Sequence, residues 1–263
     1  MSIEHRIEAW ISCHDIHKII SDTNILNPHE ARYITIYFYK SKVVFVASDS
    51  NKYYVRSIPG QSHILWSNPN TPRSDSEPMG HIVLNKAELK KVVEQCPKQG
   101  YFAFECKPDL AIRLYIDRQV GFFFINNQED IQPLESKRQN VIKCVEIDAG
   151  DFKEITQRLR KTANKSHLQN AITLSSFEIG NKCYAMRLAI MEAPHLAEVA
   201  RGIRVSYPFS ITTDWNTINL ILSLLVSHST ICISSCEEGL LFEMGESRLL
   251  VQRSIKYQEA LAV

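Results

Sequence analysis

Basic side chains recur along one face of a segment with helical periodicity, residues 151–165 (DFKEITQRLRKTANK). Phe152, Ile155 and Leu159 are spaced three and four apart, which predicts that one side of a helix packs on a core. The opposite side would carry cationic and amide groups, which suit weak, sequence-independent contacts with nucleic-acid phosphates. The residues of this predicted basic side are Lys153, Gln157, Arg160, Lys161 and Asn164, with Arg158 and Lys165 at its margins. A merely solvated helix face is the alternative interpretation.

Sequence patterns that carry catalysis or bind cofactors are missing from the chain. It contains no GxxxxGK[ST], GxGxxG, HExxH or GxSxG motif. Cys232 and Cys236 have no His or Cys pair at ligand spacing beside them, so buried thiols are a better interpretation than a metal site. We therefore expect no catalytic residue, no metal and no cofactor. An enzyme whose carboxylates meet only in three dimensions stays open as an alternative.

Charge and composition restrict the class of protein. Lys and Arg number 30 against 29 Asp and Glu, so no global basic field indicates a nucleic-acid binder, although a local basic face is compatible with this balance. Hydrophobic residues make up 44% and charged residues 22% of the 263 positions, which excludes wholesale disorder. Seven cysteines without a CxxC pair, and an N-terminus without signal-peptide features, predict a reducing, intracellular and cytoplasmic location. The apolar runs are all shorter than the roughly 20 residues of a membrane span.

Three further segments have the apolar spacing of helices, namely residues 14–23, 86–95 and 214–226. The last of these offers only neutral polar groups on its exposed side, and Thr212 and Thr213 precede it as expected N-caps. The cationic residues that the other two helices would expose are Lys18, Lys86, Lys90 and Lys91.

Strand patterns dominate the rest of the chain, because β-branched and aromatic residues gather in short runs between turn residues. The predicted strands include residues 32–39 and 41–47, which form a hairpin, and residues 101–106, 111–116 and 120–125. Residues 60–78 hold three prolines and many polar residues, which predicts a long exposed loop. Residues 126–140 are polar with few large apolar side chains, which is typical of a linker.

The order of these elements repeats in the two halves of the chain. The phrase AWISCHDIHKII parallels VEIDAGDFKEIT at an offset of about 136 residues, and KAELKKVVEQ parallels WNTINLILSL at about 129 residues. Self-similarity at half the chain length indicates a duplicated domain. We therefore predict an α+β protein with a first domain over residues 1–125, a linker over 126–140 and a second domain over 141–263.

A duplicated unit of this kind resembles the DNA sliding clamps, which include the bacterial β clamp, proliferating cell nuclear antigen and the phage trimeric clamps. The resemblance covers nearly the whole chain and depends on the phrases VEIDAGDFKEI, FSITTDWNTINLILSLL and ISSCEEGLLFEMGESRLLVQRS, with IVLNKAELKKVVEQC in the first half. It implies two tandem clamp domains, each with two helices packed on antiparallel sheets. The near-neutral charge and the loop over residues 60–78 depart from many clamps.

The function that the resemblance implies is that of a non-enzymatic processivity factor. Such a protein encircles duplex DNA as a ring, independent of sequence, and tethers DNA polymerase and other proteins through clamp-binding peptides after a clamp loader has opened it. The resemblance also implies a place in the nucleoid or another replication compartment. A processivity factor that binds DNA without closing a ring is the alternative, followed by a metal-dependent nucleic-acid enzyme. The DNA-binding residues would be Lys18, Lys86, Lys90, Lys91, Lys153, Gln157, Arg158, Arg160, Lys161 and Lys165.

The resemblance further implies two protein-binding surfaces. Client peptides would dock beside the linker and the C-terminal tail, at Ile131, Pro133, Leu134, Leu261 and Val263. Two domains per chain would require a homotrimer, with residues 119–125 of one chain pairing with residues 195–205 of the next. The interface residues would be Val120, Phe122, Phe123, Phe124, Leu196, Val199 and Ile203. The alternative is a monomer in which the strand with Phe122–Phe124 is central to its own sheet.

Overall fold

The computed structural model describes most of the chain. The described residues are 7–24, 26–59, 61–64, 76–95, 100–106, 111–116, 119–125, 141–164, 166–180, 183–191, 193–200, 204–225 and 230–252. None of the helices within these ranges is long and apolar enough to cross a membrane. The chain divides into two compact units, and the main boundary falls between Pro133 and Leu134. Unit 1 contains residues 1–50 and 54–133, and unit 2 contains residues 51–53 and 134–263.

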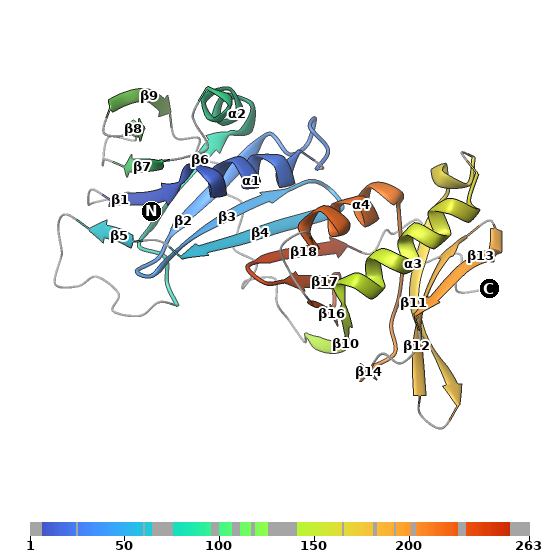
Figure 1. The fold of residues 1–263 in the computed structure, drawn as a ribbon. Helices are drawn as coiled ribbons and strands as arrows, with labels where there is room; N and C mark the ends of the chain where they lie inside the picture. Colours follow the sequence, from blue (N-terminus) through green and yellow to red (C-terminus); the bar gives the residue numbers. More distant parts are fainter. Residues whose placement is uncertain are drawn as a thin grey trace. The chain divides into compact units, whose positions relative to one another are not determined.

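Unit 1 contains two sheets and two helices, which Figure 1 draws in blue to green. One sheet has the strand order β5-β1-β7-β8-β9, and the other strands follow the order β4-β3-β2-β6. The elements are β1 (Ile7–Ser12), α1 (Cys13–Thr23), β2 (Tyr33–Phe38), β3 (Lys42–Ser48), β4 (Lys52–Pro59), β5 (Gln61–Ile64), β6 (Gly80–Asn85), α2 (Lys86–Glu94), β7 (Tyr101–Cys106), β8 (Ala111–Ile116) and β9 (Gln119–Ile125).

Unit 2 repeats this plan and is drawn in yellow-green to red (Figure 1). Its strands follow the orders β14-β10-β16-β17-β18 and β13-β12-β11-β15. The elements are β10 (Ile142–Asp148), α3 (Ala149–Thr162), a short 3-10 helix (His167–Gln169), β11 (Ile172–Gly180), β12 (Cys183–Ile190), β13 (Ala193–Ala200), β14 (Arg204–Val205), β15 (Ser210–Thr213), α4 (Trp215–Leu224), β16 (Thr230–Ser235), β17 (Gly239–Met244) and β18 (Ser247–Gln252).

The two units have the same topology. Raising each strand number of unit 1 by nine converts both of its strand orders into those of unit 2, and α1 and α2 become α3 and α4. The predicted duplication and the predicted α+β class are therefore confirmed. The offsets also hold at the level of single residues, because the N-cap residues of equivalent helices, Ser12 with Asp148 and Asn85 with Asp214, lie at the offsets read from the sequence.

The helices begin where a polar side chain accepts a hydrogen bond from a backbone N–H of the first turn. Asp148 accepts from Gly150 N, and Asp214 accepts from Thr217 N at 2.6 Å. The expectation that Thr212 and Thr213 cap α4 was wrong, because both residues pair with β11 as part of β15. Asp214 takes the cap position because it is the first residue after the strand, and its carboxylate also suits the positive end of the helix.

The core of each unit lies under the apolar faces of its helices. Phe152, Ile155 and Leu159 of α3 are buried as the periodicity predicted. In unit 1, the rings of Phe38 in β2 and Phe104 in β7 lie 6.5 Å apart, so residues from both sheets contribute to one core.

Two strand predictions need correction. The expected loop over residues 60–78 contains β5, which pairs antiparallel with β1, while residues 65–75 lie outside the described part of the chain. The sequence QSHI of β5 is short and polar, so its pairing is decided by its neighbour in the sheet. Residues 195–205 do not form one strand, because residues 195–200 lie in β13 whereas residues 204–205 form β14, which pairs with β10 in another sheet.

Candidate nucleic-acid interface

The exposed side of α3 carries the basic residues that the sequence predicted for it. Since Phe152, Ile155 and Leu159 are buried, the opposite residues face solvent. Among these residues, Gln157, Arg158, Arg160 and Lys161 are exposed and Lys153 is half-buried. Lys165 lies outside the described residues.

The cations of α3 differ in their acidic partners. Arg158 donates to Glu154 one turn earlier and also lies 3.9 Å from Glu198 of β13, so two carboxylates offset its charge. The hydrogen bond to Glu154 raises the pKa of Arg158. Lys153, Arg160 and Lys161 have no ion pair with any described residue, and we call these three residues the α3 basic face. Arg160 and Lys161 lie in the last turn, where the helix dipole favours positive charge.

The basic residues of unit 1 are less available than the sequence predicted. Lys86 was expected to be exposed, and this was wrong: it is 7% exposed, and its Nζ donates a hydrogen bond of 2.6 Å to the carbonyl of Thr23. Burial, and then the neighbouring charge of Lys90, lower the pKa of Lys86. Lys86 is the first residue of α2 and lies against the last residue of α1, so its ammonium group binds the end of that helix.

The other predicted cations of the helices vary in exposure. Lys90 lies 3.8 Å from Glu94 on the next turn of α2, Lys91 is exposed, and Lys18 of α1 is half-buried. Helix α4 has no charged residue between Trp215 and Leu224. Within the described part of the chain, cations without an acidic partner therefore gather on α3 more than on any other helix.

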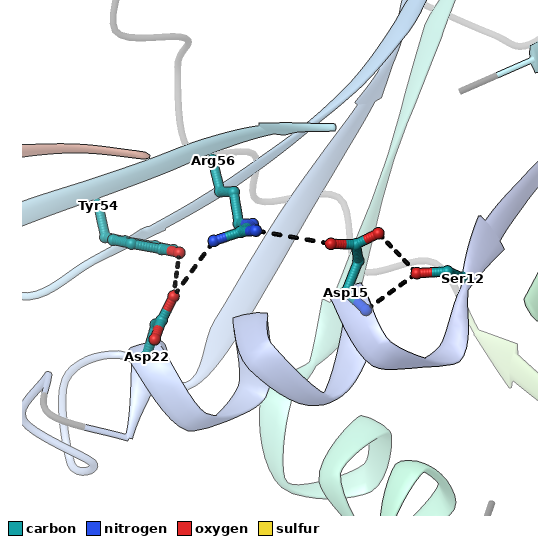
Figure 2. Close-up of polar contacts among 5 residues, drawn as sticks. All are labelled: Ser12, Asp15, Asp22, Tyr54 and Arg56. Atoms are coloured by element: carbon teal, nitrogen blue, oxygen red, sulfur yellow. Dashed lines mark hydrogen bonds and ion pairs between the residues drawn. The ribbon is translucent and has the colours of Figure 1, made fainter. Parts of the chain in front are cut away.

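A buried ionic cluster joins α1 to β4 in unit 1, and sequence reasoning missed it (Figure 2). The guanidinium of Arg56 lies 3.5 Å from Asp15 and 3.7 Å from Asp22, and the Arg56 side chain is only 6% exposed. Tyr54 donates a hydrogen bond of 2.8 Å to Asp22. The Ser12 hydroxyl donates to Asp15 at 2.6 Å, which ties the cluster to the start of α1.

Burial decides the direction in which the pKa of Asp22 shifts. It raises the pKa of Asp22, and the hydrogen bond from Tyr54 and the charges of Arg56 and Lys18 offset only part of that rise. Asp15 and Asp22 both lie near the guanidinium of Arg56, so the cluster links α1 to β4 within unit 1. The available signal was a single Arg within the aromatic strand KYYVRSIP, because a cation at such a position needs acidic partners from elsewhere in the chain.

The remaining predicted site residues fall largely outside what the structure describes. Strand β9 pairs with β8, and the side chains of Val120 and Phe122–Phe124 lie outside the described part of the structure. Leu196 and Val199 are half-buried in β13. The predicted site residues outside the described part are Ile131, Pro133, Leu134, Ile203, Leu261 and Val263.

The described residues contain no group of three or more His, Cys, Asp and Glu side chains that could hold a metal ion. An open groove of about 540 Å³ lies between α3 and β13. Charged side chains of both signs line it, namely Asp151, Glu154, Arg158 and Glu198.

Comparison with known proteins gives matches in structure. No family model and no curated protein matches the sequence. The β sliding clamp of Caulobacter crescentus superposes with a TM-score of 0.68 at 12% identity, over 97% of this chain and 68% of that chain. The Bartonella birtlesii sliding clamp, DNA polymerase III subunit beta, gives a TM-score of 0.69 at 12% identity with the same coverage. The DNA polymerase sliding clamp of Bacillus subtilis gives 0.65 at 14% identity, over 95% of this chain and 64% of that chain.

These clamps are longer proteins, and the chain spans 64–68% of their length. At such low identity a structural match establishes the fold, while activity and partners have to be argued from the site. The duplicated topology and the superposition agree over nearly all of the sequence, and together they confirm the fold that the resemblance implied. This chain has the fold of the DNA sliding clamps.

Proposed function

We propose that this protein is a DNA processivity factor, a sliding clamp that encloses duplex DNA and tethers replication enzymes without catalysing a reaction itself. The observation that carries the proposal is the α3 basic face on a chain with the clamp fold and a net charge of only +1. A clamp must hold DNA weakly enough to slide, so a few cations on one surface suit the task better than a strongly basic protein.

The contacts would be made with phosphates and would carry no sequence information. Lys153, Arg160 and Lys161 have no acidic partner among the described residues, so their charges are available for phosphate neutralisation. Arg158 would contribute less, because Glu154 and Glu198 offset its charge. Lys86 would act only through the position of α2, because it is buried.

Charge reversal tests the DNA face. The triple variant Lys153→Glu, Arg160→Glu, Lys161→Glu should lose retention on circular DNA while its thermal unfolding stays close to wild type. The matched control reverses Lys40, Lys143 and Arg248, which changes the net charge equally but lies on strands and turns. The control should retain DNA like wild type. Equal retention by the α3 variant and wild type would remove α3 from the DNA face.

The assembly we propose is a homotrimeric ring. β9 and β13 each lie at an end of the strand order of their own sheet, so each offers an edge for pairing with another chain. This position also argues against the alternative in which β9 is a central strand. Such a contact is heterologous, and six equivalent units close a ring with three chains of 30.2 kDa, about 90 kDa in total. The bacterial β clamps with the same fold are longer chains, of which this chain spans 64–68%.

Sedimentation at micromolar concentration tests the ring. The trimer should appear at about three times the chain mass of 30.2 kDa, with dissociation on dilution. A species of 30.2 kDa that persists even on DNA would overturn the ring and favour a processivity factor that binds DNA on one face.

The partners we propose are duplex DNA, DNA polymerase and other proteins with clamp-binding peptides, a clamp loader, and further copies of this chain in a cytoplasmic replication compartment. The peptide pocket would lie at Ile131, Pro133 and Leu134 of the linker and Leu261 and Val263 of the tail. A polymerase-derived peptide should protect residues 126–140 from hydrogen exchange. Protection only elsewhere would move the pocket.

A further inference from the structure

The guanidinium of Arg160 lies over an aromatic ring. Its Cζ is 5.7 Å from the centroid of the Trp215 ring. Trp215 is the first residue of α4 and is 6% exposed, whereas Arg160 is exposed in the last turn of α3. The pair therefore joins the end of one helix to the beginning of the next within unit 2.

The indole contributes through its face. Its Nε1 is buried and has no hydrogen-bond partner within the described part of the chain, so the N–H makes no contact there that would explain a tryptophan. A smaller apolar residue would fill part of the same space without burying an unpaired N–H. What the large ring adds is a flat surface beneath the Arg160 guanidinium.

We propose that Trp215 is a positioning residue for Arg160, and that it orients this guanidinium for contact with a DNA phosphate. A guanidinium that lies on a ring keeps the N–H groups along its edge available, and these form the fork that binds phosphate oxygens in pairs. Contact with the ring also restricts the Arg160 side chain before DNA binds, so less side-chain conformational entropy is lost on binding. The inference rests on the proposed DNA-binding function and adds to it a residue that does not itself touch DNA.

Unit 1 lacks this arrangement at the equivalent positions. By the offsets of the two helices, Asn24 is the residue of unit 1 equivalent to Arg160, and Lys86 is the residue equivalent to Trp215. In unit 1 the first residue of the second helix is itself a cation, Lys86. Its ammonium group donates a hydrogen bond to the Thr23 carbonyl and is therefore not presented to a ligand. Of the two helix junctions, the one in unit 2 therefore has a cation over an indole ring, whereas the one in unit 1 has a buried lysine bound to a carbonyl.

The experiment is a double-mutant cycle on DNA affinity. Binding of the full-length protein to a labelled short DNA duplex is measured by fluorescence anisotropy at low salt, for Trp215→Leu, Arg160→Gln and the double variant. Trp215→Leu should weaken binding about two- to fivefold, the range that corresponds to a cation–π contact at a partly exposed site. In the Arg160→Gln background the same change should have no further effect. Trp215→Phe, which keeps an aromatic face, should retain most of the affinity.

Two controls separate positioning from folding. Ile218→Ala removes a buried side chain of the same helix one turn later and should lower the melting temperature without changing DNA affinity. In the free protein, NMR should show the Arg160 side-chain protons shifted upfield by the indole ring, a shift that Trp215→Leu abolishes.

The outcomes are distinct. Three results would each overturn the positioning role, even if the α3 charge reversal abolishes binding. Trp215→Leu could bind DNA as well as wild type, it could lose the same affinity with Arg160 and with Gln at position 160, or the Arg160 protons could show no upfield shift. If wild-type protein itself does not bind the duplex, the proposed function fails as well.

Discussion

Helix α1 of unit 1 carries Asp22 at the position where α3 of unit 2 carries Arg158, as the shared offset of the two helices shows. The partner on the fourth strand of each unit also changes sign. Arg56 of β4 lies 3.7 Å from Asp22, and Glu198 of β13 lies 3.9 Å from Arg158. The side chains of the first pair are both 6% exposed, whereas those of the second are 53% and 21% exposed.

Where the two helices of each unit meet, the cation is again buried in unit 1 and exposed in unit 2. In unit 1 the buried Lys86 donates to the Thr23 carbonyl, and in unit 2 the exposed Arg160 lies over the buried Trp215. Unit 1 therefore uses its cations to hold its own elements together, while unit 2 presents them on the surface. Two copies of one topology can thus carry different charges at equivalent positions, because the topology fixes where residues lie and not which residues they are.

The largest expected effect is the loss of the buried cation in unit 1. Arg56→Met leaves Asp22 buried without its cation, and Asp15 loses the same partner, which should lower the free energy of unfolding by about 3–5 kcal/mol. The equivalent change in unit 2, Arg158→Met, should cost far less, since that pair is exposed to solvent. Urea unfolding followed by circular dichroism measures both. Similar losses for the two variants would show that burial does not distinguish the two pairs.

The second effect is on DNA binding, and it should be larger for unit 2. Neutralising Lys153 and Lys161 with Gln should reduce the slope of log affinity against log salt by about one for each lysine that contacts a phosphate. Neutralising Lys90 and Lys91 changes the net charge equally but should reduce the slope less, because Glu94 already lies 3.8 Å from Lys90. A larger reduction for the unit 1 pair would place the main DNA contacts on α2.

The helix caps should behave alike in both units. Ser12 accepts a hydrogen bond from Asp15 N at 3.1 Å, and Asp148 accepts one from Gly150 N at 2.6 Å. Ser12→Ala and Asp148→Ala should each lower the free energy of unfolding by about 1 kcal/mol, while Asp148→Asn keeps an acceptor and should cost less. Thermal unfolding of the three variants checks this. If the two Ala variants lost clearly different amounts of stability, the units would differ in their helix caps as well as in their charged side chains.

Much of the architecture could be predicted from the sequence because it depends on local patterns. The spacing of Phe152, Ile155 and Leu159 alone defines the buried face of α3, and hence which cations lie opposite. The duplication was visible because equivalent helices keep their positions relative to the strands around them. The helix predicted over residues 86–95 agrees within one residue with the observed α2, which Asn85 caps.

What could not be predicted depends on contacts between distant residues. Whether Lys86 is exposed is decided by the carbonyl of Thr23, which lies 63 residues earlier in the chain. The partners of Arg56 are equally distant in sequence, so its strand predicts a buried cation without naming its acids. Helical periodicity gives the side of a helix on which a residue lies, but not what packs against that side.

The smallest expected effect is on the pH dependence of stability, and the units should differ in its sign. Burial raises the pKa of Asp22 above the usual value of 3.8 in the folded protein, so its contribution to stability is greatest below that pH and declines as pH rises through the raised pKa. In unit 2 the hydrogen bond from Lys143 lowers the pKa of Glu146 below its usual value of 4.5. The contribution of Glu146 is therefore present above that pH and is lost as pH falls.

Two substitutions isolate these contributions. The free energy of unfolding of wild type minus that of Asp22→Asn should decrease as pH rises from below 3.8 toward neutrality, because the folded protein holds the Asp22 proton more tightly than the unfolded chain does. The same difference for Glu146→Gln should increase over the acid range, and by little, because Lys143 and Glu146 are exposed. Asparagine can still accept the hydrogen bond from Tyr54, so the comparison tests charge more than packing. Urea unfolding at a series of pH values measures both differences. If the Asp22 difference increased with pH, the attraction of Arg56 would exceed the cost of burial, and the cluster in unit 1 would act as an ordinary ion pair like that in unit 2.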